Sequence, residues 1–236
     1  MMAGSPAPRP GTSHPVAVRD PKPMLHRTLA QWGGAGDLWV FAYASLIWRP
    51  DFDVVEQRKA KVHGWHRALK MWSRINRGTI ECPGLVFALL SGGSCQGAVL
   101  KVERRHGEEV MHKLWDREMS TGVYDPRWLR CNTRQGPVHA LAFTLSRHSP
   151  NFTGELSAEQ YRDIFSKSCG KYGSTLEYAD LTLRCLHTHG IHDPALKKLL
   201  LHAQCGEGHA GFDRPTVGKV GGPGKNGADR PGANGH

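Results

Sequence analysis

The sequence lacks any apolar run long enough to indicate a membrane segment. Its longest apolar stretch, from Leu38 to Trp48, is interrupted by Ser45 and is shorter than the ~18 residues that a membrane helix needs. The N-terminal residues, MMAGSPAPRPGTSHP, contain no apolar core of the kind found in secretory signals. We therefore expect a cytoplasmic protein without a membrane segment.

The sequence also has few of the common metal, redox and nucleophile motifs. Its six cysteines are scattered without a CxxC pair, so we expect reduced, structural thiols. His187, His189 and His192 have a spacing found in some metal sites, but such spacing arises by chance among 14 histidines. No Ser-His-Asp or Cys-His arrangement is visible. We expect neither a metal nor a cofactor.

The composition indicates one globular domain between two tails. Of the 236 residues, 39% are hydrophobic and 22% are charged, which suits a chain that buries a real core. Residues 1–24 are rich in proline, serine and alanine, and residues 206–236 are polar and glycine-rich, so we expect both to be disordered around a domain at 25–205. The net charge of +10 favours anionic partners.

Hydrophobic patterning predicts strands early in the chain and helices late, which favours an α+β fold over an alternating parallel sheet. A glycine-rich turn at 91–96 is expected to join two strands into a hairpin. A capping box of Ser157 with Gln160, and Asp193 followed by Pro194, are typical of helix starts. The expected strands lie at 39–46, 63–72, 85–90, 97–103 and 139–146, and the expected helices lie at 107–119, 157–170, 175–188 and 193–206.

One carboxylate lies on the apolar face of an expected helix. With about 100° per residue and Val110 at zero, Leu114 falls near ~40°, Trp115 near ~140° and Glu118 between them near ~80°. Burying a carboxylate is costly unless its pKa rises or a cation pairs with it. Glu118 is therefore a candidate general base or acid, with a structural ion pair or a frayed helix end as the alternatives.

The first strand runs into small residues that let a ligand approach the backbone. Ala42 and Ala44 leave the main chain accessible, Ser45 adds a hydroxyl, and consecutive amides can bind a carboxylate. Any buried strand followed by a turn has a similar pattern, so this feature alone is weak evidence for a ligand-binding loop.

Taken together, these segments resemble the ChaC family of γ-glutamylcyclotransferases over about residues 37–200. The resemblance implies a mixed β-barrel flanked by helices, and cleavage of glutathione to 5-oxoproline and Cys-Gly by a carbon–nitrogen lyase without a metal or cofactor. The matching blocks are LWVFAYASLIWRPDF at 38–52, GWHRALKMW at 64–72, RGT at 77–79, PGLVFALLSGGSCQGAV at 83–99, WDREMSTGVYDPRW at 115–128 and GSTLEYADLTLRCLHTHGI at 173–191.

The resemblance also implies the site. It makes Glu118 the catalytic residue and the first loop the substrate-binding segment. Tyr124 and Tyr178 are candidate hydrogen-bond donors, with core packing as their alternative. The substrate-binding segment comprises Val40, Phe41, Ala42, Tyr43, Ala44, Ser45 and Leu46.

One departure concerns the loop, which reads AYAS where the family usually has GYGS. If Ala44 had to adopt a positive φ, the cost would be roughly 1–2 kcal/mol. This departure favours the alternative of a non-catalytic γ-glutamyl-binding module. A second alternative is a cyclotransferase for another γ-glutamyl peptide or amine, because the leaving-group side of the pocket has no readable motif. Arg74 and Arg77 are compatible with contact to a distal carboxylate, although solvated basic residues are the plainer interpretation.

The basic, aromatic stretch at 65–77 is typical of single-strand nucleic-acid binders. Because it lies inside the matching blocks, we interpret it as barrel wall. We expect a small-molecule substrate, glutathione or a related γ-glutamyl peptide, no nucleic acid, no membrane partner, and a monomer or weak dimer.

Overall fold

The structure, a computed structural model, describes residues 19–204. Five strands form a closed barrel in the order β1-β3-β2-β4-β5. Neighbouring strands are antiparallel except β1 and β5, which run parallel where Val40 pairs with Leu141. This mixed barrel with helices around it confirms the predicted α+β fold. The barrel strands are β1 (Leu38–Ala42), β2 (Glu56–Ser73), β3 (Gly84–Val102), β4 (Asp125–Thr133) and β5 (Gly136–Thr144).

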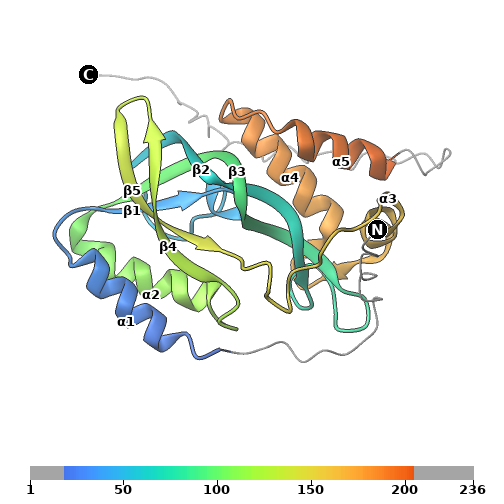
Figure 1. The fold of residues 1–236 in the computed structure, drawn as a ribbon, viewed down its shortest axis with the longest axis horizontal. Helices are drawn as coiled ribbons and strands as arrows, with labels where there is room; N and C mark the ends of the chain where they lie inside the picture. The colour runs from blue at the N-terminus through green and yellow to red at the C-terminus, as the bar shows by residue number, and fades with distance from the viewer. Residues whose placement is uncertain (1–18, 205–236) are drawn as a thin grey trace, which may run out of the picture. The chain divides into compact units, whose positions relative to one another are not determined.

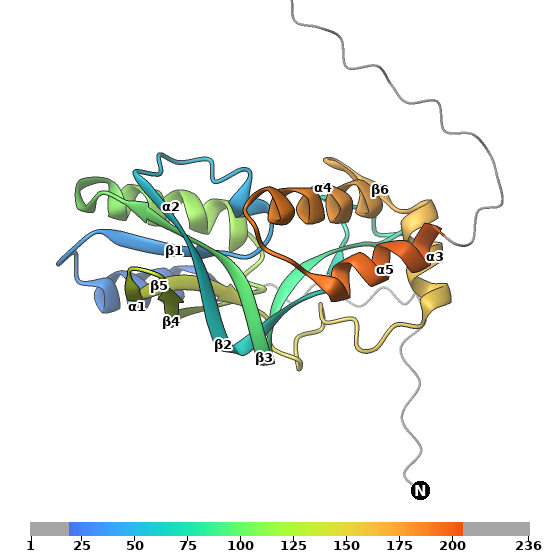
Figure 2. The same cartoon turned by 90° about the horizontal axis from the view of Figure 1, so that it is seen from above.

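The helices form two groups at opposite ends of the barrel, as Figure 1 and Figure 2 show. At one end, α1 (Lys22–Trp32) contacts α2 (Gly107–Glu118). At the other end, three helices contact one another: α3 (Ala158–Lys167), α4 (Thr175–Thr188) and α5 (Pro194–Gln204). None of the helices within the described range is long and apolar enough to cross a membrane. The short elements are η1 (Ser45–Ile47), η2 (Arg104–His106), β6 (Cys169–Gly170) and β7 (Gly173–Ser174).

Strands β2 and β3 form a long antiparallel ribbon that joins the two ends of the molecule (Figure 2). The hairpin predicted at 85–103 is wrong, because residues 91–96 continue β3 and pair with β2 around His63 and Trp65. The register shifts at that point, and Gly64 and Gly92 have φ values of 79° and 97°. Glycine here permits a bulge within a long strand rather than a chain reversal.

The predicted helix starts are confirmed. The Ser157 side chain accepts from Gln160 N, and Gln160 reaches back to Ser157 N. Asp193 Oδ1 accepts from Leu196 N at 2.9 Å and caps α5. The predicted end of α3 at Gly170 is wrong, since the helix stops at Lys167 and residues 169–170 pair with β7.

Helix α1 was not predicted from the sequence. Pro23 lies in its first turn, Gly33 ends it at a φ of 65°, and it buries Leu25 and Thr28. The extension expected over 1–24 overlaps this helix and Arg19. The expectations for residues 1–18 and 206–236 lie outside the described residues, as does Cys205. The five described cysteines form no disulfide among themselves.

Arg19 ties the chain ahead of α1 to the loop that follows α2. Its guanidinium donates to Gly122 O at 2.6 Å, to Tyr124 O at 2.8 Å and to Asp125 Oδ1 at 2.8 Å. The segment before the first helix thereby helps to fix the backbone on either side of Tyr124.

Candidate active site

Helix α2 carries Glu118 in its last turn. The face predicted from the helical period is confirmed, because Val110, Leu114 and Trp115 are buried. Met119 N donates to Trp115 O at 2.8 Å, so the helix is intact at its end and the frayed alternative does not apply. The Glu118 side chain is 17% exposed and lines two adjoining cavities.

Arg117 links Glu118 to the loop that follows β1. Its Nε donates to Glu118 Oε1 at 3.0 Å and its Nη2 to Ser45 Oγ at 3.2 Å. Its Nη1 donates to the Arg49 carbonyl and to Asp51. Within the described residues Oε2 of Glu118 has no hydrogen-bond partner in the protein. The ion-pair alternative therefore holds for one carboxylate oxygen and leaves the other open to a ligand.

Burial raises the pKa of Glu118 above its usual range. The adjacent Arg117 favours the ionised carboxylate and offsets part of this effect, whereas the negative charge of Asp51 adds to the rise. A raised pKa makes the carboxylate a stronger proton acceptor, and the same group can return the proton later in a reaction.

Three buried tyrosines surround the inner cavity, a recess of about 30 Å³ that Glu118 also lines. The Tyr43 hydroxyl donates to Phe143 O at 3.0 Å. Burial raises the pKa of Tyr43, Tyr124 and Tyr178, so each keeps its hydroxyl proton near neutral pH. Tyr178 also packs against Phe87, with ring centroids 5.3 Å apart. Tyr178 therefore both packs in the core and lines the recess.

The loop after β1 lines the recess from its first residue. Ala44 and Ser45 line the recess, and Leu46 and Tyr43 do so as well. Ala44 has a φ of −145°, outside the left-handed region that favours glycine. In the described part of the chain Asp51 is the one non-glycine residue with a positive φ. The cost expected for a positive φ therefore does not arise at Ala44.

The other predicted loop residues lie apart from the recess. Val40, Phe41 and Ala42 belong to β1 and are fully buried. None of them lines either cavity. They form part of the barrel wall, in the strand that leads directly into the loop.

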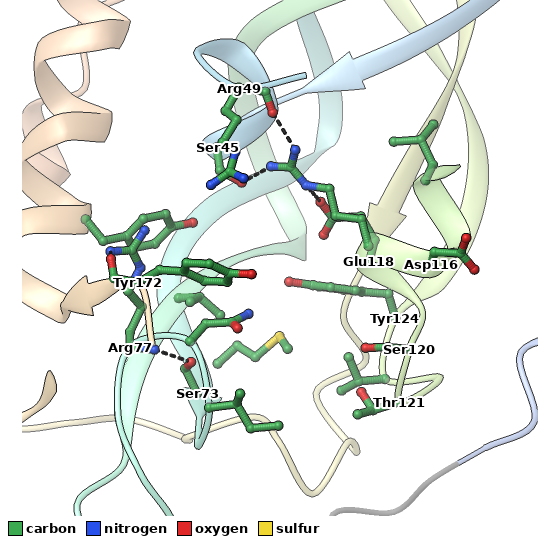
Figure 3. A pocket seen from close by; sticks show the side chains of 18 of the residues that line it. Ser45, Arg49, Ser73, Arg77, Asp116, Glu118, Ser120, Thr121, Tyr124 and Tyr172 are labelled. Atoms are coloured by element: carbon green, nitrogen blue, oxygen red, sulfur yellow. Dashed lines mark hydrogen bonds and ion pairs between the residues drawn. The ribbon is translucent and has the colours of Figure 1, made fainter. Parts of the chain in front are cut away.

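A larger cavity of about 560 Å³ adjoins the recess and extends to the end of β2. Figure 3 shows Glu118 and Tyr124 on one side of it and Arg77 and Tyr172 on the other. The Arg77 guanidinium lies over the Tyr178 ring, 4.7 Å from its centroid. Residues from the ribbon, α2, α4 and the β6–β7 hairpin thus meet at one cavity.

The far wall of this cavity is basic. Arg74 and Arg77 are half-buried there and line the cavity. Arg74 Nη1 donates to Oδ1 of Asn151 at 3.1 Å. Asn151 is 4% exposed, and its Nδ2 has no hydrogen-bond partner in the described protein. The sequence offered no signal for Asn151 or Tyr172, because distant segments bring them to the cavity.

Comparison with known proteins agrees with this architecture. Residues 38–205 match the family model described as ChaC-like protein. The glutathione-specific γ-glutamylcyclotransferase of Escherichia coli is 30% identical over 178 residues, covering 75% of this chain and 77% of the relative. The glutathione-specific γ-glutamylcyclotransferase of Schizosaccharomyces pombe is 28% identical, covering 64% of this chain and 83% of the relative.

The same fold occurs in a solved structure. The crystal structure of the γ-glutamyl cyclotransferase specific to glutathione from yeast superposes with a TM-score of 0.65 at 20% identity, covering 72% of this chain and 96% of that one. The family match extends over most of the chain, and the fold agrees with it. The chain therefore belongs to the ChaC-like family of γ-glutamylcyclotransferases.

Proposed function

We propose that this protein cleaves glutathione to 5-oxoproline and Cys-Gly, with Glu118 moving the protons. The observation that carries the proposal is the buried Glu118 carboxylate, with one oxygen open to a recess lined by neutral tyrosines. The names of the E. coli and S. pombe relatives, which specify glutathione, support the choice of substrate.

The reaction needs no group beyond the side chains of the site. The substrate α-ammonium gives a proton to Glu118, and the freed amine attacks the γ-carbonyl carbon to close a five-membered ring. The bond to the cysteinyl nitrogen breaks as Glu118 returns this proton to that nitrogen. The ring nitrogen then gives up its second proton through Glu118 to the released amine, so the products are 5-oxoproline with a lactam N–H and Cys-Gly with an α-ammonium. Neither water nor a protein nucleophile enters the products, and holding the glutamyl group in a cyclising conformation supplies much of the acceleration.

The two cavities divide the substrate between them. The recess, about 30 Å³, receives only the end of the glutamyl head, whose α-carboxylate accepts hydrogen bonds from the Ala44 region and Ser45 beside Tyr43, Tyr124 and Tyr178. The larger cavity receives the rest of the substrate, including the cysteinyl-glycine part. Its basic wall favours a leaving group that ends in a carboxylate, which supports a peptide over a simple γ-glutamyl amine.

The test is to incubate the protein with reduced glutathione and to quantify 5-oxoproline and Cys-Gly. We expect equal amounts of both, and a rate for Glu118→Gln that is lower by roughly 10²–10⁴-fold. Glu108→Gln, on the exposed first turn of the same helix, is the matched control and should keep the wild-type rate. A fully active Glu118→Gln protein would exclude the assigned role of this carboxylate.

A second comparison distinguishes the substrates. Arg74→Gln should raise KM for glutathione about tenfold but leave KM for γ-glutamylethylamide, which has no distal carboxylate, unchanged. Turnover of γ-glutamylethylamide in preference to glutathione would favour the other-substrate alternative. Tight binding of glutathione without any product would favour a non-catalytic binding module.

A further inference from the structure

Arg67 in β2 is buried outside both cavities. Its side chain is 4% exposed, and arginine is rarely buried to this extent without several partners. Its Nε and Nη2 donate to Asp193 Oδ2 at 2.9 and 2.6 Å. Its Nη1 donates to Tyr43 O at 2.8 Å and to Gln96 O at 3.0 Å. One guanidinium thus connects the loop after β1, strand β3 and the start of α5.

The bond to Tyr43 O has a consequence on the other side of the same peptide. The described peptide bonds are all trans, and a planar trans peptide directs the next N–H opposite to its carbonyl. Holding the Tyr43 carbonyl on Arg67 therefore directs the Ala44 N–H away from Arg67. Ala44 itself lines the recess.

This N–H has no partner in the protein. Ala44 is 7% exposed, and within the described residues its N–H donates no hydrogen bond. Buried backbone N–H groups are nearly always paired, so an unpaired one beside a cavity indicates an acceptor supplied by a ligand.

We propose that Arg67, held by Asp193, is a positioning residue that presents the Ala44 N–H to the α-carboxylate of the substrate. This inference rests on the proposed function, because the acceptor is the glutamyl head of glutathione. The planar fork of arginine suits the task, since it reaches two carbonyls and one carboxylate at once. Lysine has its three N–H donors on a single nitrogen, so it cannot span the three acceptors in this arrangement.

Binding and kinetics test the role together. Arg67→Lys should raise KM for glutathione about tenfold or more while kcat changes less than about threefold. Asp193→Asn should have a smaller effect in the same direction, because asparagine still caps α5. The control is Arg58→Lys. Arg58 pairs with Glu56 elsewhere on β2, away from both cavities, so this substitution should leave KM unchanged. An unchanged KM in a folded Arg67→Lys protein would overturn the proposal.

Two measurements keep this test separate from the proposed function. Calorimetry in the Glu118→Gln background should give a weaker Kd for glutathione when Arg67→Lys is added, without any need for turnover. Hydrogen exchange of residues 43–46 should become faster in Arg67→Lys but not in Arg58→Lys. If the wild type neither binds nor cleaves glutathione, the proposed function fails. In that case, faster exchange of residues 43–46 in Arg67→Lys would still support the inference that Arg67 fixes the loop. Unchanged exchange would refute that inference.

Discussion

Adding a methyl group at Gly97 should damage both the fold and the candidate site. A Cβ on this β3 residue would lie 2.3 Å from Ala42 O and 2.9 Å from the Phe41 ring. The oxygen belongs to backbone at the end of β1 and cannot rotate away, so β1 must shift by about 1 Å to restore ordinary contact. Overpacking of this kind costs about 1–3 kcal/mol of unfolding free energy.

For a domain of this size we expect Gly97→Ala to lower Tm by about 2–12 °C. Because the displaced Ala42 leads directly into the loop of Ala44 and Ser45, kcat/KM for glutathione should fall by about 10–100-fold. Thermal unfolding followed by circular dichroism and the product assay measure the two effects.

Gly36→Ala is the matched control for this substitution. Its added Cβ would meet no atom within 4 Å, and Gly36 has no positive φ. Its Tm should therefore equal or slightly exceed that of the wild type. A Gly97→Ala protein with wild-type Tm and activity would refute the close-contact reasoning. A low Tm with unchanged kcat/KM would refute only the transmission from β1 to the loop.

Three further predictions concern the site and its support. Because burial raises the pKa of Glu118 above the ordinary 4.5, the folded state binds this proton more tightly than the unfolded state. The free energy of unfolding therefore falls as the pH rises from about 4.5 to the pKa of Glu118 in the folded state. Glu118→Gln should therefore be more stable than wild type near neutral pH, with the gap closing below about pH 4.5 in pH-dependent melts, and a gap that widens in acid would contradict this sign. Ala44→Gly should give no gain in activity and lose up to about 1 kcal/mol in urea unfolding, because the φ of −145° needs no glycine, so a marked gain would show that alanine impairs the loop. Thr175→Val should cost about 1–3 kcal/mol in the same assay, since the buried Thr175 Oγ1 accepts from Leu85 N at 2.9 Å, and an unchanged urea midpoint would show that this bond contributes nothing.

The features that could be predicted from the sequence depend on local chemistry. The Ser157 and Asp193 caps rest on contacts three residues away, and each is present in the structure. The buried turn of α2 at Glu118 follows from the helical period alone. Such signals need no knowledge of the rest of the chain.

The features that could not be predicted depend on distant segments. Residues 91–96 have the composition of a turn, and only their pairing with β2 makes them strand. Helix α1 has weak local signals and is stabilised by tertiary contacts such as that of Trp115 Nε1 with Pro21 O at 3.0 Å. Asn151 reaches the basic wall because Thr153 and Asn151 pair with the end of β2. Sequence spacing contains none of this information.

The contacts of Arg19 have a practical consequence for truncation. A protein shortened to begin at residue 25, where the composition changes, would lose Arg19 together with the first turn of α1. The carbonyls of Gly122 and Tyr124 would then lose the guanidinium that they share, and Tyr124 would be held less firmly beside Glu118. Low turnover in such a shortened protein would reflect the missing anchor rather than the chemistry of the carboxylate. Any version made for enzymology should therefore begin upstream of Arg19.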